Sequence, residues 1–132
     1  MTVSDKDLIQ AATEARKNAY SAYSGYSVGA AIVDDQERLH LGCNIENAAY
    51  PLGNCAETSA IAAMVLEGGK CIDRIAIVGG KGEPSACTPC GGCRQRLFEF
   101  ADDNTVVIVL DDNGEWRHYP IAELLPAGFR LS

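Results

Sequence analysis

Residues 54–69 read NCAETSAIAAMVLEGG, and this stretch fixes the centre of the fold. Asn54 is a good helix N-cap and Gly68-Gly69 is a good C-terminal stop, so we expect a helix from Cys55 to Glu67. Residues 60–66 are apolar on every side of that helix. This pattern predicts that the helix is buried.

Apolar runs on both sides of this helix predict the strands of a sheet. A polar turn at 34–38 separates the first two of them, which suggests a hairpin. Hairpins favour antiparallel pairing, whereas strands joined through crossover helices favour parallel pairing. We therefore expect an α/β fold in one domain, residues 1–132, with three α/β/α layers and a mixed five-stranded sheet. The expected strands are 28–33, 39–45, 72–78, 105–110 and 116–119, and the other helices are 4–21 (capped by Ser4), 90–100 and a last helical turn at 121–125.

Composition limits the classes of partner. The chain has 132 residues, 47% of them hydrophobic, which is enough for a real core, and its net charge is −7. An acidic chain is a poor partner for nucleic acid or for an anionic membrane, and a small neutral substrate fits better. No secretory signal is visible at the N-terminus, and the longest apolar run, Ala60–Leu66, is too short to cross a bilayer. We expect a cytoplasmic protein whose six cysteines are metal ligands and buried thiols.

Three of the cysteines have the spacing of metal ligands. Cys55 begins the predicted central helix, and Cys90 and Cys93 occur in the segment PCGGC at residues 89–93. Three thiolates leave the fourth position of a tetrahedral zinc free for water, as in catalytic zinc sites. All three lie at predicted helix starts, where backbone N–H groups lower the pKa of cysteine. We therefore predict one Zn²⁺ per chain, with Glu57 as a nearby carboxylate that is not needed as a ligand.

Each part of this pattern also has a simpler interpretation. Glu57 lies three residues after Asn54, where a glutamate often completes a capping box. The pair Cys90 and Cys93 alone is compatible with a redox site or with half of a structural zinc site, which Cys87 could help to complete. We interpret Cys43, Cys71 and Cys87 as small buried side chains. The complete pattern, a Cys-x-Glu followed by Pro-Cys-x-x-Cys, is the signature of zinc-dependent deaminases of cytosine and adenine.

Several further segments match one known family in the same order along the chain: YSGYSVGAA at 23–31, NIENAAYPL at 44–52, CAE at 55–57, PCGGCRQ at 89–95 and LLPAGF at 124–129. In these segments, and over nearly its whole length, the chain resembles the small, homotetrameric type of cytidine deaminase. The resemblance implies zinc-dependent hydrolysis of cytidine or deoxycytidine to the uridine nucleoside and ammonia, in pyrimidine salvage. It also implies the fold of that family.

The resemblance also implies roles at the reacting centre. By analogy Cys55, Cys90 and Cys93 bind zinc. Glu57 takes a proton from the zinc-bound water, passes it to N3 of the base and helps to protonate the departing amine. One carboxylate can transfer both protons if it lies within hydrogen-bond reach of the water and the ring. The backbone of Ala56 is expected to contact the pyrimidine.

Further residues are assigned to the sugar and to a neighbouring subunit. The resemblance places Asn44 and Glu46 on the ribose hydroxyls, which an amide and a carboxylate can bind. It places Tyr26 beside the nucleoside. It also implies that Tyr50 and Phe129 help to build the site of a neighbouring subunit in a homotetramer. The apolar tail residues Leu124, Leu125 and Phe129 independently suggest a surface that a partner could cover.

The chain departs from the family pattern at two places. Thr58 stands where the family often has an Arg that offsets the charge of the zinc thiolates, and we expect Arg94 or the helix N-termini to compensate. Tyr26-Ser27 replaces the common Phe-Pro and adds a hydroxyl on the sugar side. The remaining alternatives are a relative acting on another aminopyrimidine nucleoside, such as the blasticidin deaminases, a polynucleotide-editing deaminase, which the acidic charge disfavours, and a structural zinc module.

Overall fold

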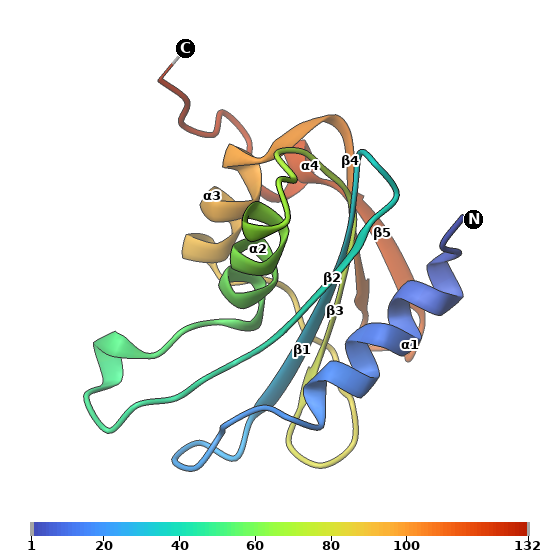
Figure 1. The fold of residues 1–132 in the computed structure, drawn as a ribbon. Coiled ribbons are helices and arrows are strands. Elements are labelled where there is room, and N and C mark those ends of the chain that lie inside the picture. The colour runs from blue at the N-terminus through green and yellow to red at the C-terminus, as the bar shows by residue number, and fades with distance from the viewer. Residues whose placement is uncertain (1, 132) are drawn as a thin grey trace.

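A five-stranded mixed sheet lies at the centre of the computed structural model, which describes residues 2–131 (Figure 1). The strands follow the order β2-β1-β3-β4-β5 across the sheet. Their bounds are β1 Ser27–Asp34, β2 Leu39–Cys43, β3 Ile72–Gly80, β4 Ala101–Leu110 and β5 Trp116–Pro120. The helices are α1 Asp5–Arg16, α2 Ala56–Leu66, α3 Gly91–Glu99 and α4 Ile121–Leu124, with a 3-10 turn η1 at Tyr50–Leu52.

The pairing of the strands explains where the helices begin. Strand β1 is antiparallel to both β2 and β3, so β2 and β3 run in the same direction. Strand β3 is parallel to β4, and β4 is antiparallel to β5. Helix α2 follows β2 and helix α3 follows β3. The N-termini of both helices therefore lie at the same end of the sheet, beyond the carboxyl ends of β2 and β3.

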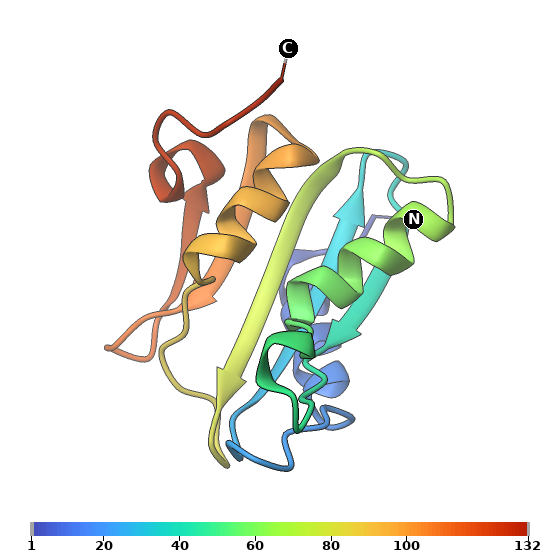
Figure 2. The same cartoon turned by 90° about the vertical axis from the view of Figure 1, so that its left-hand side faces the viewer.

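The two faces of the sheet carry separate apolar clusters, because successive strand residues point to opposite sides. Ala31 and Val33 of β1 pack with Leu8 and Ala12 of α1 on one face. Ala30 and its alternate neighbours pack under α2, α3 and α4 on the other face. Figure 2 shows α2 and α3 side by side over that second face. The predicted three-layer α/β/α class with a mixed five-stranded sheet is confirmed.

Two glycines let helices approach the sheet closely. A Cβ atom on Gly29 of β1 would lie 2.0 Å from the carbonyl oxygen of Ala12 in α1. A Cβ atom on Gly42 of β2 would lie 2.3 Å from the backbone nitrogen of Ala60 in α2. Only glycine fits at either position. The second contact holds α2 directly on β2 and so places its N-terminus near the end of that strand.

The first helix is shorter than predicted. Ser4 caps it as expected, because its Oγ accepts a hydrogen bond from the Asp7 N–H at 3.1 Å. The helix ends at Arg16 and not near residue 21. The reason lies in Tyr20, whose N–H donates to the Asn44 carbonyl at 3.0 Å and whose carbonyl accepts from the Glu46 N–H at 2.8 Å. These bonds commit Tyr20 to an extended conformation that a helix could not supply.

Helix α2 differs from its prediction in its N-cap and in its burial. Its N-cap is Cys55 and not Asn54. Asn54 exchanges two backbone hydrogen bonds with Ile45, both of 2.9 Å, and is therefore held outside the helix. The expectation of complete burial is also wrong, because Val65 is 49% and Leu66 85% exposed in the single chain. The helix covers the sheet with one face and presents its apolar outer face to the surface.

The other elements lie close to their predicted positions. The β1-β2 hairpin, β3, β5 and the turn α4 are all present, whereas β4 begins four residues earlier than expected and η1 was not predicted. No helix among residues 2–131 combines the length and the apolar character that crossing a bilayer would require.

Candidate active site

A pocket of about 790 Å³ opens at the end of the sheet where α2 and α3 begin. Its floor includes the starts of both helices, and its outer wall comes from the segment after β2 and from the loop before β1. Ligand sites of α/β proteins usually lie beyond the carboxyl ends of the strands. Nine of the ten residues predicted for the site line this pocket: Tyr26, Asn44, Glu46, Tyr50, Cys55, Ala56, Glu57, Cys90 and Cys93.

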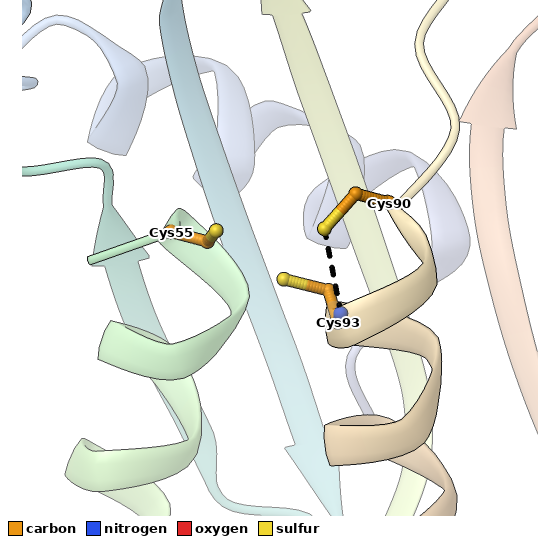
Figure 3. A group of neighbouring side chains, drawn as sticks. All are labelled: Cys55, Cys90 and Cys93. Atoms are coloured by element: carbon orange, nitrogen blue, oxygen red, sulfur yellow. Dashed lines mark hydrogen bonds between the residues drawn. The ribbon is translucent and has the colours of Figure 1, made fainter. Parts of the chain in front are cut away.

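Three cysteine side chains meet on the floor of the pocket (Figure 3). Cys55 is the N-cap of α2, Cys90 is the N-cap of α3, and Cys93 lies in the first turn of α3. Their Sγ atoms all lie within 4.8 Å of one another. A tetrahedral zinc with Zn–S bonds of about 2.3 Å holds its sulfur atoms roughly 3.8 Å apart. The donor set and its spacing therefore fit Zn²⁺ with small side-chain adjustments.

Cys87 does not belong to this metal-binding group. It lines the same pocket, but within residues 2–131 the group that could hold a metal consists of Cys55, Cys90 and Cys93. The Cys87 thiol instead interacts with the Tyr26 hydroxyl. Three sulfur ligands leave a zinc ion one open position, which is the arrangement of a catalytic site. Cys43, Cys71 and Cys87 are each partly buried, so their interpretation as buried side chains holds only in part.

The three thiols differ in their tendency to ionise. Hydrogen bonds from the backbone N–H groups of Cys93 and Gly92 help to lower the pKa of Cys90, as expected at a helix start. Burial raises the pKa of Cys55, and burial together with the charge of Glu57 raises the pKa of Cys93. The prediction that all three helix-start positions lower the cysteine pKa therefore holds only for Cys90. A divalent cation favours the thiolate form of all three.

Glu57 lies in the first turn of α2 with only 5% of its surface exposed, and its carboxyl belongs to the pocket wall. Burial raises its pKa, while its own backbone N–H, the Cys93 thiol and the charge of Arg96 act in the opposite direction. The capping-box interpretation fails, because Cys55 is the N-cap and the Asn54 N–H is bound to Ile45. Glu57 is thus a buried carboxyl close to the metal cluster, and it is not the capping-box partner of Asn54.

Asn44 and Glu46 stand on the outer wall, and other parts of the chain hold both of them in place. The Asn44 side chain accepts from the Val28 N–H at 2.8 Å and donates to the Tyr26 carbonyl at 2.9 Å. Glu46 accepts from the N–H groups of Tyr23 and Ser24, at 2.9 and 3.0 Å, and from the Ser24 hydroxyl. Both residues line the pocket, and each side chain keeps unused hydrogen-bonding capacity.

Sequence reasoning missed the role of Ser24 as a partner of Glu46. Its hydroxyl also accepts a hydrogen bond from the Tyr26 N–H at 2.9 Å, so one serine links the pocket wall to the start of β1. Ser24 lies within the quoted segment YSGYSVGAA, but that segment gives no indication of its partner. The pairing of Ser24 with Glu46 joins residues 22 positions apart and cannot be read from either segment alone.

Tyr50 and Phe129, both predicted for the site of a neighbouring subunit, occupy different places in the single chain. Tyr50 is 78% exposed at the rim, where its ring lies 6.3 Å from that of Tyr23. Phe129 is not among the pocket residues; it is 66% exposed, and its backbone is bound to the Gln95 side chain on α3. The structure therefore does not bring Phe129 to the site of its own chain.

The hydroxyl of Tyr26 lies close to Cys87 and Ser85, in the loop that follows β3. Tyr26 and Cys87 both line the pocket. The hydroxyl that distinguishes this chain from the common Phe thus has neighbours within its own chain.

The expected compensation for Thr58 through Arg94 is not what the structure contains. The guanidinium of Arg94 donates to the carbonyls of Pro89 and Leu124, at 2.8 and 3.0 Å, and so ties α4 to the start of α3. The cation beside the cluster is Arg96, whose Nη1 lies 3.8 Å from the Cys93 Sγ. Its position three residues after Cys93 on a helix was the available signal, because such residues share a face.

Comparison with known proteins agrees with this geometry. The family model described as "Cytidine and deoxycytidylate deaminase zinc-binding region" matches residues 2–109. The chain is 37% identical to a cytidine deaminase of Sporosarcina psychrophila over 122 residues, which cover 92% of this chain and 88% of that protein. It is 39% identical to a cytidine deaminase of Mycoplasma pneumoniae over 118 residues, which cover 89% and 87% of the two chains.

A solved structure shares both the sequence and the fold. The crystal structure of cytidine deaminase from Burkholderia pseudomallei superposes with a TM-score of 0.86 at 37% identity, covering 96% of this chain and 99% of the other. The family model spans both α2 and α3, and with them the three cysteines and Glu57. The chain therefore belongs to the cytidine and deoxycytidylate deaminase family.

Proposed function

We propose that this chain hydrolyses the bond between C4 and the exocyclic amine of cytidine and deoxycytidine, giving uridine or deoxyuridine and ammonia, as a cytoplasmic enzyme of pyrimidine salvage. The observation that carries the proposal is the buried Glu57 beside three clustered thiols in a pocket whose outer wall holds Asn44 and Glu46. All 132 residues form one catalytic domain in this proposal.

Cys55, Cys90 and Cys93 are the proposed ligands of one Zn²⁺ per chain. Their spacing and the lack of a fourth sulfur in the cluster of described residues support a catalytic site over a structural one. When bound, the zinc supplies the positive charge that lowers the pKa of a water molecule and prepares it for attack at neutral pH. The backbone N–H groups at the start of α3 help to hold Cys90 as a thiolate.

Glu57 is the proposed general base and general acid. Its carboxylate accepts a proton from the attacking water and delivers one to N3 of the cytosine ring, and it then helps to protonate the amine as C4–N cleaves. A group that both takes and gives protons works best when its pKa lies near the working pH. Burial moves the pKa of Glu57 upward, in that direction.

Asn44 and Glu46 are proposed to bind the ribose hydroxyls. The second N–H of the Asn44 amide and the free lone pairs of Glu46 are available for a diol, while the backbone bonds of both residues fix their orientation. The backbone of Ala56 and the ring of Tyr26, which also line the pocket, are proposed to contact the base and the sugar. The acidic chain and the small pocket favour a free nucleoside over a polynucleotide.

A homotetramer is proposed as the working form, with Tyr50 and Phe129 contributing to the site of a neighbouring subunit. Both side chains are exposed in the single chain, as are apolar residues on the outer face of α2 and on β2 that another copy could cover: Leu39, Leu41, Val65 and Leu66. Light scattering with size-exclusion chromatography tests this assembly. A monomer at micromolar concentration would contradict it.

The test of the activity combines ammonia release with metal analysis. We expect the purified protein to contain one zinc per chain and to release ammonia from cytidine and deoxycytidine. The variant Glu57→Gln should keep its zinc and lose turnover, because the amide cannot accept the proton. A wild-type protein that loads zinc but turns over no cytosine nucleoside would favour the structural-zinc alternative.

A further inference from the structure

Arg96 is the positively charged side chain beside the cysteine cluster. It lies on α3, three residues after Cys93, and its Nη1 is 3.8 Å from the Cys93 Sγ. Residues three apart on a helix share one face, so the guanidinium folds back along α3 toward its N-terminus. The charge of Arg96 also acts on Cys55 and Glu57 on the neighbouring helix α2.

The site needs such a cation. Three thiolates around Zn²⁺ carry one net negative charge, and an ionised Glu57 close by adds another. An excess of negative charge weakens the activation of a metal-bound water. Thr58, next to Glu57, brings no charge, and Arg94 is bound to two backbone carbonyls.

Gly92 gives the guanidinium its room. A Cβ atom at this position would lie 3.3 Å from the Arg96 Nη1 and 3.9 Å from the Cys90 Sγ. Any larger side chain at position 92 would therefore compete with Arg96 for the space above the first turn of α3. The absence of a side chain at Gly92 allows Arg96 to lie across that turn and reach Cys93.

We propose that Arg96 is a positioning residue of the zinc site: it donates a hydrogen bond to the Cys93 thiolate and offsets the negative charge of the cluster. This inference rests on the proposed function, because it assumes that the three cysteines hold zinc. It assigns to α3 the cation that the family often carries on α2, at the position of Thr58. The chain thus has the charge balance of the family from a different residue.

The first test measures metal affinity by competition with a zinc chelator. Arg96→Met removes both charge and donor and should weaken zinc binding about 10- to 100-fold, the usual effect of losing a group that supports a metal ligand. Arg96→Lys keeps the charge and should recover most of that loss. Arg117→Met is the matched control, since it removes the same charge from an exposed position on β5 and should leave zinc affinity unchanged.

A second test uses cobalt and a relocated charge. In Co²⁺-substituted protein the sulfur-to-metal absorption band reports the electron density of the thiolates, and Arg96→Met should shift it. Adding Thr58→Arg to Arg96→Met should restore both the band and the zinc affinity. Circular dichroism of each variant checks the fold, which substitutions at the exposed Arg96 and the half-buried Thr58 should not disturb.

The outcomes separate this inference from the proposed function. If the wild type binds zinc and deaminates cytidine but Arg96→Met binds zinc equally tightly, only the role of Arg96 is overturned. If affinity falls and neither Arg96→Lys nor Thr58→Arg restores it, charge balance is also rejected, because packing alone explains the loss. A wild type that binds no zinc overturns the proposed function itself.

Discussion

Helix α2 has a buried carboxyl group near each of its ends, and the two behave in opposite ways. Glu57 lies in its first turn, in the pocket. Asp34 ends β1 and packs against the other end of the helix, where a Cβ atom on Gly69 would lie 2.9 Å from its Oδ2. Arg38, which is bound to Asp34, also donates to the Glu67 carbonyl at 2.8 Å and so caps the helix.

Hydrogen-bond donors account for the difference between them. Burial works against ionisation of Asp34, but bonds from His40, from the backbone of Arg38 and Gln36 and from the Arg38 side chain lower its pKa to about 2. Its partners lie at 2.8–3.0 Å. Glu57 has few donors, and burial raises its pKa. A buried carboxyl saturated with donors fixes structure, whereas one that is poor in donors is available for proton transfer.

The largest effect that we predict from this comparison is a loss of turnover when Glu57 is replaced. Glu57→Gln should lower kcat by about 10²- to 10⁴-fold, the usual contribution of a general acid–base. The same variant should not reduce the free energy of unfolding, because the amide replaces a carboxyl whose ionised form burial disfavours. Steady-state kinetics and urea unfolding of the zinc-loaded protein measure the two quantities. A variant that loses stability as well as activity would show that Glu57 also serves the fold.

The matching amide substitution at the other end of α2 should have the reverse effect. Asp34→Asn leaves the donors of Arg38 and His40 facing a neutral amide and should cost about 3 kcal/mol of unfolding free energy. Turnover per folded molecule should stay close to that of the wild type, since Asp34 is not among the pocket residues. Urea unfolding and kinetics at a temperature well below the transition test this. A large fall in kcat with unchanged stability would contradict the division of roles.

The stabilisation by Asp34 should depend on pH. Its pKa falls from 3.8 in the unfolded chain to about 2 in the folded one, which corresponds to about 2 kcal/mol. Because the folded pKa is the lower one, this stabilisation is fully present above pH 3.8 and is lost as the pH falls toward 2. The stability difference between the wild type and Asp34→Asn should therefore shrink over this range. Using the difference cancels the loss of zinc in acid, which affects both proteins.

The contrast between the two carboxyls also marks what the sequence could predict. The cysteines and Glu57 lie in two short segments at the starts of helices, so their spacing, together with the deaminase signature, predicted which side chains meet there. The network around Asp34 depends on the register of β1 and β2, which pairs Ile32 with His40 and so brings His40 near the turn. No local pattern encodes that register. For the same reason the N-cap at Cys55 was missed, since the pairing of Asn54 with Ile45 decides it.

The directions of the long side chains around the site were the hardest feature to predict. Arg94 and Arg96 are two residues apart on α3 and look equivalent in the sequence. Helix geometry turns Arg94 toward α4 and Arg96 toward the cluster. The expectation named Arg94 or the helix N-termini and did not consider Arg96, because the presence of a motif does not determine the direction of a side chain.

A third carboxyl, that of Glu46, extends the comparison, and the effect that we predict for it is the smallest. Glu46 lies on the pocket wall, and hydrogen bonds from the Ser24 side chain, the Ser24 backbone and the Tyr23 backbone lower its pKa. It is more exposed than Asp34 and has fewer donors, so it should combine the two roles: held by the chain and still free to bind a hydroxyl.

Ser24→Ala removes one of its donors and one anchor of the Tyr26 backbone. We expect KM for cytidine to rise severalfold with little change in kcat, because the proposed contact of Glu46 with the sugar is the same in the ground state and the transition state. Ser21→Ala is a suitable control, since its hydroxyl bonds to Ser27 outside the pocket lining. If kcat falls by the same factor as KM rises, Glu46 also helps to orient the reacting carbon. The contacts to the sugar and to the base are then energetically coupled.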